Sequence, residues 1–165
     1  MSFVSTMTIP QLGLGAGYAL WGFRAAAVGQ IECPALVRGY RRLFEKSADD
    51  ALSAVLVFAR TIGSEGVRRI GLGVPGCCGV TSDELSIAAV LSAAQAEDTS
   101  RRDAHLLWLL GCTGDGASAR AADDVAAAFL VSGLVIEQPP VELQSNPNPR
   151  TESNIVRTLH VAGNA

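Results

Sequence analysis

The chain has 165 residues, of which 48% are hydrophobic and 18% are charged, and its formal net charge is -3. This length is typical of one domain, and a domain of this size can be stable on a hydrophobic core alone. The acidic balance argues against a dedicated nucleic-acid-binding domain, which usually carries an excess of Lys and Arg. Aromatic residues make up only 5% of the chain, so the core is expected to consist mainly of Ala, Leu, Val and Ile.

The sequence predicts no membrane span, because it contains no run of about 18 apolar residues. Residues 1–10 lack the basic segment and cleavage site of a signal peptide. Two of the four cysteines, Cys77 and Cys78, are adjacent. Consecutive Cα atoms lie about 3.8 Å apart, whereas a disulfide prefers about 4.4–6.8 Å. With Cys33 and Cys112, this pattern does not resemble a secreted disulfide framework, and a cytoplasmic location is expected.

The first half of the chain predicts three helices, because apolar residues recur there at helical spacing. The predicted ranges are 18–28, 34–46 and a third helix around 51–62. Pro34 suits the first turn of the second helix, and Ser47 is the expected N-cap of the third. The stretch 51–62 is apolar almost all round, which is typical of a helix buried at the centre of a domain.

A strand and a capped helix are predicted next. Large residues alternate with glycine over 69–74, and the turn residues Pro75–Gly76 follow. Thr81 and Glu84 have the spacing of a capping box. A fourth helix is therefore expected to begin at Thr81 or directly after it and to reach about residue 96.

Two further helices are expected over 100–110 and 119–132, with Gly111 and Gly133 as their C-caps. The predicted fold is therefore mostly α, with about six helices and one or two short strands.

The composition changes after residue 136, where prolines stand among Gln, Asn and Ser. We expect a single helical domain over 1–136 and a Pro/Asn-rich tail over 137–165. Within this tail, 155–161 alternates apolar and polar residues, so it could form a terminal strand that pairs with 69–74, remain disordered, or dock on a second subunit.

The candidate functional site lies where the predicted strand leads into the capped helix. Cys77 and Cys78 occur there in a glycine-rich turn, shortly before Thr81. Backbone N–H groups at a helix start attract anions and lower the pKa of a nearby thiol. These three residues are therefore candidates for ligand binding or redox chemistry. The alternative is a structural role, since cysteine is often a small buried hydrophobe.

His105 and Cys112 are candidates for completing a metal site. They are seven residues apart and therefore share one helix face. With Cys77 and Cys78 they would form a set of three sulfurs and one nitrogen, which zinc accepts. The spacing matches no short zinc motif, so no cofactor is the leading expectation, with zinc or an iron–sulfur cluster as the alternative.

No hydrolytic site is predicted. The chain has no Gly-x-Ser-x-Gly or His-Glu-x-x-His motif. Asp83 and Glu84 are neighbours in the first turn of a helix and point in different directions. Helix capping explains them better than paired acid–base catalysis, so the chain is not predicted to be an enzyme.

The cysteine order is similar to that of the cysteine-rich domain of heterodisulfide reductase-like proteins. The similarity rests on Cys33, Cys77-Cys78-Gly79 and Cys112, and it implies an iron–sulfur or zinc site with redox work. The pattern of that family closes with Cys-x-x-Cys, whereas Cys112 is followed by Thr113-Gly114-Asp115. One ligand is therefore missing.

The range 23–110 also resembles a family of small bacterial proteins of unknown function. The residues that carry the resemblance are Phe23-Arg24, Arg41-Arg42, Arg69-Ile70, Pro75, Cys77-Cys78, Thr81 and Asp83-Glu84. That family has a Pro-Cys-Cys-Cys turn before Thr-x-Asp-Glu, and Gly76 stands here where a cysteine would be expected. The resemblance implies a helical fold and no activity.

The sequence thus predicts a non-enzymatic helical protein that binds a protein partner or forms a homo-oligomer. Helices rich in small residues, such as 25–27, 88–89 and 126–128, would allow close packing within or between chains. The alternative is a thiol-based metal-binding or redox protein centred on Cys77 and Cys78.

Overall fold

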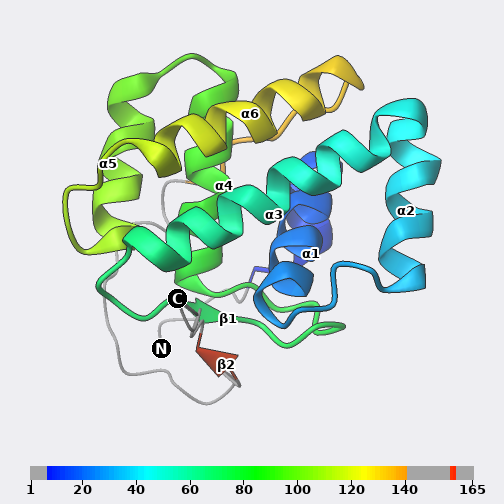
Figure 1. Cartoon of the computed structure of the whole chain (residues 1–165), viewed down its shortest axis with the longest axis horizontal. Helices are drawn as coiled ribbons and strands as arrows, with labels where there is room; N and C mark the ends of the chain where they lie inside the picture. The colour runs from blue at the N-terminus through cyan, green and yellow to red at the C-terminus, as the bar shows by residue number, and fades with distance from the viewer. Residues whose placement is uncertain (1–6, 141–156, 159–165) are drawn as a thin grey trace.

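The computed structural model describes residues 7–140 and the backbone of residues 157–158. The described chain is mostly helical, as predicted, with one short pair of strands (Figure 1). Its α-helices are α1 (Leu14–Ala27), α2 (Pro34–Phe44), α3 (Ala48–Glu65), α4 (Ser82–Gln95), α5 (Thr99–Leu110) and α6 (Ala117–Val131). Two short 3-10 helices, Ile9–Leu12 and Glu45–Ser47, precede α1 and α3. None of the described helices is long and apolar enough to cross a membrane, and the cytoplasmic location remains a prediction.

The most completely buried helix is α4, not the predicted 51–62. Every residue of α4 from Asp83 to Ala93 is buried, because α1, α5, α6 and β1 pack around it. Helix α3 instead buries one face, against α1, α2 and α6, and leaves Val57 and Arg60 exposed. Figure 1 shows α3 crossing the middle of the view, from α2 to the segment that leads into β1. The apolar run 51–62 therefore correctly predicted a well-packed helix, α3, but the helix at the centre of the domain is α4.

Aromatic side chains contribute more to the core than their small number suggested. The largest fully buried side chains include Tyr40, Phe23, Phe58 and Phe129. Phe44 links α2 to α6, since its ring centroid lies 5.0 Å from that of Tyr40 and 4.8 Å from that of Phe129. The core is built mainly from Ala, Leu, Val and Ile, as expected, and these few aromatic rings are its largest members.

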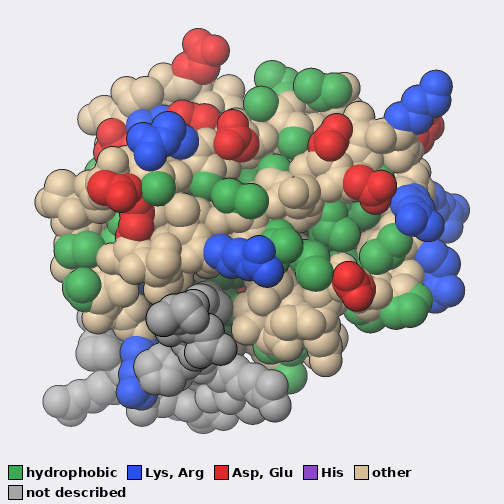
Figure 2. Space-filling model, viewed as in Figure 1, with side chains coloured by type: hydrophobic (Ala, Val, Ile, Leu, Met, Phe, Trp, Pro, Cys, Tyr) green, Lys and Arg blue, Asp and Glu red, His purple; other side chains and the backbone are tan. Residues whose placement is uncertain are grey.

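Helix α2 is amphipathic and shows how the charged side chains are arranged. Leu36, Tyr40 and Phe44 are buried at helical spacing, whereas Arg41 and Arg42 are exposed. Figure 2 shows basic side chains gathered at this end of the molecule, while acidic and apolar side chains are scattered over the rest of the face.

Helix α1 begins at Leu14, earlier than the predicted start at residue 18. Gly13, with φ of 87°, stands at its N-cap, and Gly15 and Ala16 are already buried in its first turn. The small side chains of this turn leave room for the chain that follows α6. There, Leu134 and Ile136 are buried in the core.

The side chain of Gln95 holds this extended segment in place. Its amide nitrogen donates to the carbonyl oxygen of Leu134 at 2.8 Å, and its carbonyl oxygen accepts from the backbone N–H of Ile136 at 2.8 Å. Pro139 is also buried. The described start of the predicted tail is therefore packed against the helices, although the domain boundary at 136 stays a prediction.

The strand predicted over 69–74 is shorter in the structure. Strand β1 (Gly71–Leu72) pairs antiparallel with β2 (Arg157–Thr158), with Gly71 opposite Thr158 and Leu72 opposite Arg157. This pairing is one of the three alternatives that the sequence left open for 155–161. The remainder of 155–161 lies outside the described residues.

Candidate functional site

The two adjacent cysteines lie in a loop whose backbone is shaped by a β-turn. The backbone N–H of Cys77 donates to the carbonyl oxygen of Val74 at 2.9 Å. Pro75 and Gly76, with φ of 88° at the glycine, occupy the central positions, as a type II turn requires. A Cβ atom at Gly76 would have no heavy atom within 4 Å, so the turn projects away from the protein. We call residues 74–80 the thiol loop.

The second half of the thiol loop pairs with the start of the described chain. The backbone N–H of Ile9 donates to Cys78 O at 2.8 Å, and the N–H of Val80 donates to Met7 O at 3.0 Å. These bonds flank an antiparallel bridge between Thr8 and Gly79. The loop is therefore tied on one side by backbone hydrogen bonds.

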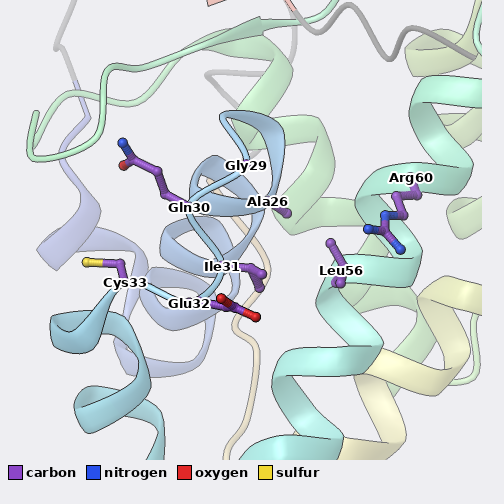
Figure 3. A pocket seen from close by; sticks show the side chains of 8 residues that line it. All are labelled: Ala26, Gly29, Gln30, Ile31, Glu32, Cys33, Leu56 and Arg60. Atoms are coloured by element: carbon purple, nitrogen blue, oxygen red, sulfur yellow. The ribbon is translucent and has the colours of Figure 1, made fainter. Parts of the chain in front are cut away.

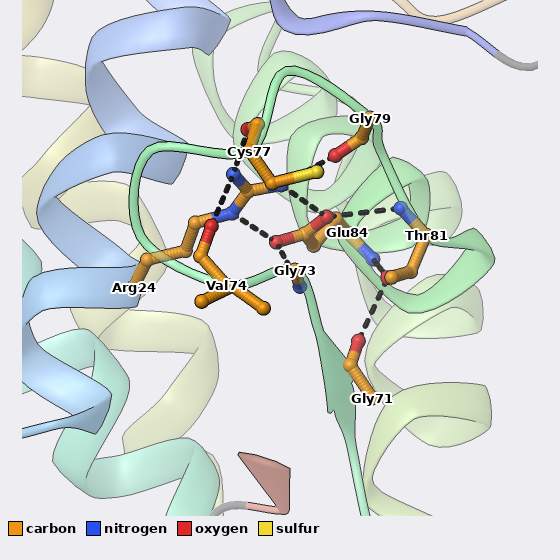
Figure 4. A network of polar contacts seen from close by, with 8 residues as sticks. All are labelled: Arg24, Gly71, Gly73, Val74, Cys77, Gly79, Thr81 and Glu84. Carbon is orange, nitrogen blue, oxygen red and sulfur yellow. Dashed lines mark hydrogen bonds and ion pairs between the residues drawn. The ribbon is translucent and has the colours of Figure 1, made fainter. Parts of the chain in front are cut away.

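On the other side, the loop is held by the guanidinium of Arg24, which reaches it from α1 (Figure 4). Arg24 is only 2% exposed. Its Nη1 donates to Cys77 O at 2.6 Å, and its Nη2 donates to Gly79 O at 2.7 Å. One buried side chain thus binds carbonyl groups on both sides of Cys78.

The charge of Arg24 is balanced by Glu84, which is fully buried in the first turn of α4. The two side chains pair through Nε–Oε1 at 2.6 Å and Nη2–Oε2 at 2.9 Å. Glu84 also accepts hydrogen bonds from the backbone N–H groups of Gly73 at 3.0 Å and Thr81 at 2.9 Å. A buried ion pair is tolerated when its remaining donors and acceptors are satisfied in this way. We call Arg24, Glu84 and these backbone partners the clamp.

Thr81 connects the clamp to the strand. Its hydroxyl accepts from the backbone N–H of Glu84 at 3.1 Å and donates to Gly71 O at 2.7 Å. The predicted capping box is therefore confirmed. The same hydroxyl fastens β1 to the start of α4, and a ligand-binding role for Thr81 stays a prediction.

Asp83 points away from Glu84, as expected for neighbours in a helix, and organises a second polar contact. It accepts a hydrogen bond from the backbone N–H of Gly71 at 2.6 Å and pairs with Arg68. The Arg68 guanidinium in turn lies over the ring of Trp108, 4.3 Å from its centroid. Burial raises the pKa of the Asp83 carboxyl, while Gly71 and Arg68 act in the opposite direction. Glu84 thus caps α4 and pairs with Arg24, and Asp83 holds Gly71 and Arg68 in place, so both carboxylates have structural roles.

Both thiols of the loop are free and exposed. Figure 4 shows the Cys77 side chain beside the Arg24 guanidinium, with its sulfur pointing toward Gly79. The interpretation of these two residues as small buried hydrophobes is therefore wrong. The structure places two accessible sulfurs on a loop whose backbone is fixed from beneath.

The four-residue metal set predicted from the sequence does not come together. Within residues 7–140, no group of three or more His, Cys, Asp or Glu side chains is placed to bind a metal ion. Cys112 lies beyond the end of α5, where its half-buried thiol donates to Glu65 O at 3.3 Å. Cys77 and Cys78 thus remain the metal candidates, without Cys112 or His105.

His105 is half-buried on α5, and its pKa is lowered by burial and by the neighbouring charge of Arg101. The unfolded chain therefore binds the proton more tightly than the folded chain. We expect the free energy of unfolding to be greatest above the ordinary imidazole pKa and to fall as the pH drops below it. Urea unfolding at pH 7 and pH 5 should show a smaller difference for His105→Gln than for the wild type. An unchanged difference would contradict this assignment.

Cys33, the fourth cysteine, lies at the start of α2 beside a cavity of about 590 Å³ (Figure 3). Backbone N–H groups of Leu36 and Ala35 lower its pKa. Its sulfur points away from Leu56 and Arg60 on the far wall. Glu32 and Arg60 are the charged residues that line the cavity, and no group of three or more potential metal ligands forms there within the described residues.

Arg24 is the functional residue for which the sequence analysis made no prediction. A signal was present, since Arg24 is the one charged residue within Leu14–Ala27. An isolated charge in an apolar helix needs a partner from elsewhere in the chain. Its partner is 60 residues away, which helical spacing cannot reveal.

The clamp can be tested at Gly73, which lies directly against the Arg24 guanidinium. A Cβ atom at Gly73 would overlap with Nη2 and Cζ of Arg24. We expect Gly73→Ala to displace the guanidinium and to lower the free energy of unfolding by about 1–2 kcal/mol. Gly79→Ala is the matched control, since its Cβ would meet only Cys77 Sγ, at 3.7 Å. Equal effects in urea unfolding would argue against the clamp.

No protein-family model, curated protein or solved structure matches this chain. The two resemblances noted from the cysteine pattern therefore stay predictions, and the function is argued from the site itself.

Proposed function

We propose that this chain is a non-enzymatic binding protein whose binding site is the thiol loop, with Cys77 and Cys78 as the ligands for a soft metal ion. The observation that carries the proposal is the exposure of both sulfurs above a buried ion pair. Thiolates bind soft and borderline ions such as Cu⁺ and Zn²⁺.

The clamp supports a binding role because it holds the loop in one shape before any ligand arrives. Arg24 and the 7–9 segment bond the backbone of the loop from two sides. A preorganised site loses less conformational entropy on binding than a flexible one. Burying a charged pair to hold an exposed loop is difficult to explain by stability alone, since such pairs are often no better than apolar residues of the same volume.

Metal binding is favoured over reversible disulfide formation for an adjacent pair. In a tetrahedral thiolate site with Zn–S bonds of about 2.3 Å, neighbouring sulfurs lie about 3.8 Å apart. Consecutive Cα atoms lie about 3.8 Å apart, and the side-chain rotamers set the separation of the two sulfurs. A disulfide requires its sulfurs to approach to about 2.05 Å and its Cα atoms to lie farther apart. A disulfide between neighbouring cysteines is therefore strained, whereas binding one ion does not require the two sulfurs to approach so closely.

A trivalent arsenical tests whether the two sulfurs can reach one atom. Phenylarsine oxide forms two As–S bonds with a pair of thiols and releases one water molecule. The test uses the Cys33→Ser/Cys112→Ser background, in which only the loop thiols remain. We expect one arsenical per chain to protect both thiols from a disulfide reagent under native conditions. Further replacement of Cys77 or Cys78 by Ser should abolish this protection.

Two results would overturn the proposal. One is that neither loop thiol reacts in the native protein. The other is that each thiol reacts independently and the arsenical protects neither. Elemental analysis of the wild-type protein purified without chelator gives a second measurement, and we expect copper or zinc that is lost in the Cys77→Ser variant.

Homo-oligomer formation, the other predicted role, was based on helices rich in small residues, and the structure uses several of these residues within the chain. Ala25, Ala88, Ala89 and Ala126 are buried, so these small residues serve packing within the chain. A self-association role has to rest on a different feature of the surface.

A further inference from the structure

We propose that one zinc ion joins two copies of this chain, with Cys77 and Cys78 of each copy as its four ligands. This inference rests on the proposed metal-binding role of the thiol loop and adds both the ion and the partner, which is a second copy of the same chain.

A zinc ion takes more ligands than the thiol loop of one chain supplies. Structural zinc sites are almost always four-coordinate, and four thiolates are one of the common sets. In the described part of the chain, no third His, Cys, Asp or Glu joins the loop cysteines in a metal-binding group. One chain therefore supplies half of a zinc site. A second copy related by a two-fold axis supplies the other half without any new residue type.

The tip of the thiol loop is accessible to a second copy of the chain. Cys77 and Cys78 are both exposed, and the preceding Gly76 faces open space. Val74 is 39% exposed and Pro75 is also exposed beside them. Two loops that meet at this exposed surface would therefore bring the cysteines of both copies close together and cover Val74 and Pro75.

The charge around the two cysteines also suits a site made of four thiolates. Four thiolates and one Zn²⁺ carry a net charge of -2, so further acidic groups would oppose assembly. The segment 71–82 contains no charged residue. The nearest carboxylates in sequence, Asp83 and Glu84, are each paired with an arginine. The loop thus contributes no additional negative charge to the interface.

A zinc titration followed by light scattering tests the bridge. We expect the metal-free protein to be monomeric and the mass to double when one zinc ion has been added for every two chains. An excess of zinc should then lower the dimer fraction, because each chain can hold its own ion. A chelator should restore the monomer. A dimer fraction that first rises and then falls as zinc is added is specific to an ion shared between two copies.

Variants and a spectroscopic probe complete the test. Cys77→Ser and Cys78→Ser should each prevent the zinc-dependent dimer, whereas Cys112→Ser, with its thiol bonded to Glu65 O, should form it normally. Circular dichroism confirms that each variant is folded. Co²⁺ in place of zinc should give the visible absorption of a tetrahedral thiolate site at one ion per two chains.

The outcomes separate this inference from the proposed function. One zinc ion per chain with no change in mass would overturn the bridge and leave the thiol loop as a metal site. A dimer that survives both the chelator and Cys77→Ser would also overturn the bridge. Absence of zinc binding together with protection by the arsenical would overturn zinc as the ion, and absence of both would overturn the two proposals together.

Discussion

Replacement of Arg24 by methionine should lower the free energy of unfolding by about 3–5 kcal/mol, the usual cost of removing one partner from a buried ion pair. Methionine fills much of the same volume but leaves the Glu84 carboxylate unpaired in the core. The carbonyl groups of Cys77 and Gly79 also lose their donors. Urea unfolding monitored by circular dichroism measures the loss, which is a large fraction of the about 5–15 kcal/mol that stabilises a typical domain.

Two comparisons make this prediction specific to the buried pair. Asp103→Asn removes one partner of Arg102 at a carboxylate that is 59% exposed, so it should cost less than about 1 kcal/mol. Adding Glu84→Gln to Arg24→Met should recover part of the stability, because it removes the unpaired charge. If the double variant is as unstable as the sum of the single variants, the two residues do not act as a pair.

Gly15→Ala should destabilise the protein by about 3 kcal/mol, at the upper end of the cost of overpacking. Alanine in a helix is ordinarily more stable than glycine by about 0.5–1 kcal/mol, so the expected sign is reversed here. A Cβ atom at Gly15 would overlap with the carbonyl group of Val135. Since the obstacle is backbone, either α1 or the segment after α6 has to move.

Gly17→Ala in the same helix is the matched control. Its Cβ would lie 3.2 Å from Cγ2 of Ile9, which is a side-chain atom that can shift. We expect Gly17→Ala to change the free energy of unfolding by less than about 1 kcal/mol. Thermal or urea unfolding of both variants decides the matter. If the two variants have similar free energies of unfolding, the close approach of Val135 to α1 does not require a glycine at position 15.

Local signals in the sequence predicted much of the fold. The Thr81-x-x-Glu84 spacing identified the start of α4, and Gly111 ends α5 in the left-handed conformation expected of a C-cap. These features depend on residues within one helical turn of each other. Short-range hydrogen bonding is therefore enough to specify them.

Long-range contacts explain what the sequence did not predict. The burial of α4 depends on the helices that surround it, and the apolar run 51–62 gave no information about those neighbours. Glu84 was assigned to capping, which is correct, but its pairing with Arg24 joins α1 to α4. Cys112 shares a helix face with His105 in sequence spacing, yet its contact is with Glu65 O at the end of α3. Pairings between distant segments follow from topology rather than from local pattern.

The clamp has a consequence for how this surface can change over evolution or by design. Within residues 74–80, Arg24 bonds to main-chain carbonyl oxygens and to no side chain. The shape of the exposed segment is therefore largely independent of which side chains it displays. Substitutions at Cys77 or Cys78 can alter the chemistry offered to the solvent while the same anchor persists beneath, so one framework could present many different recognition groups.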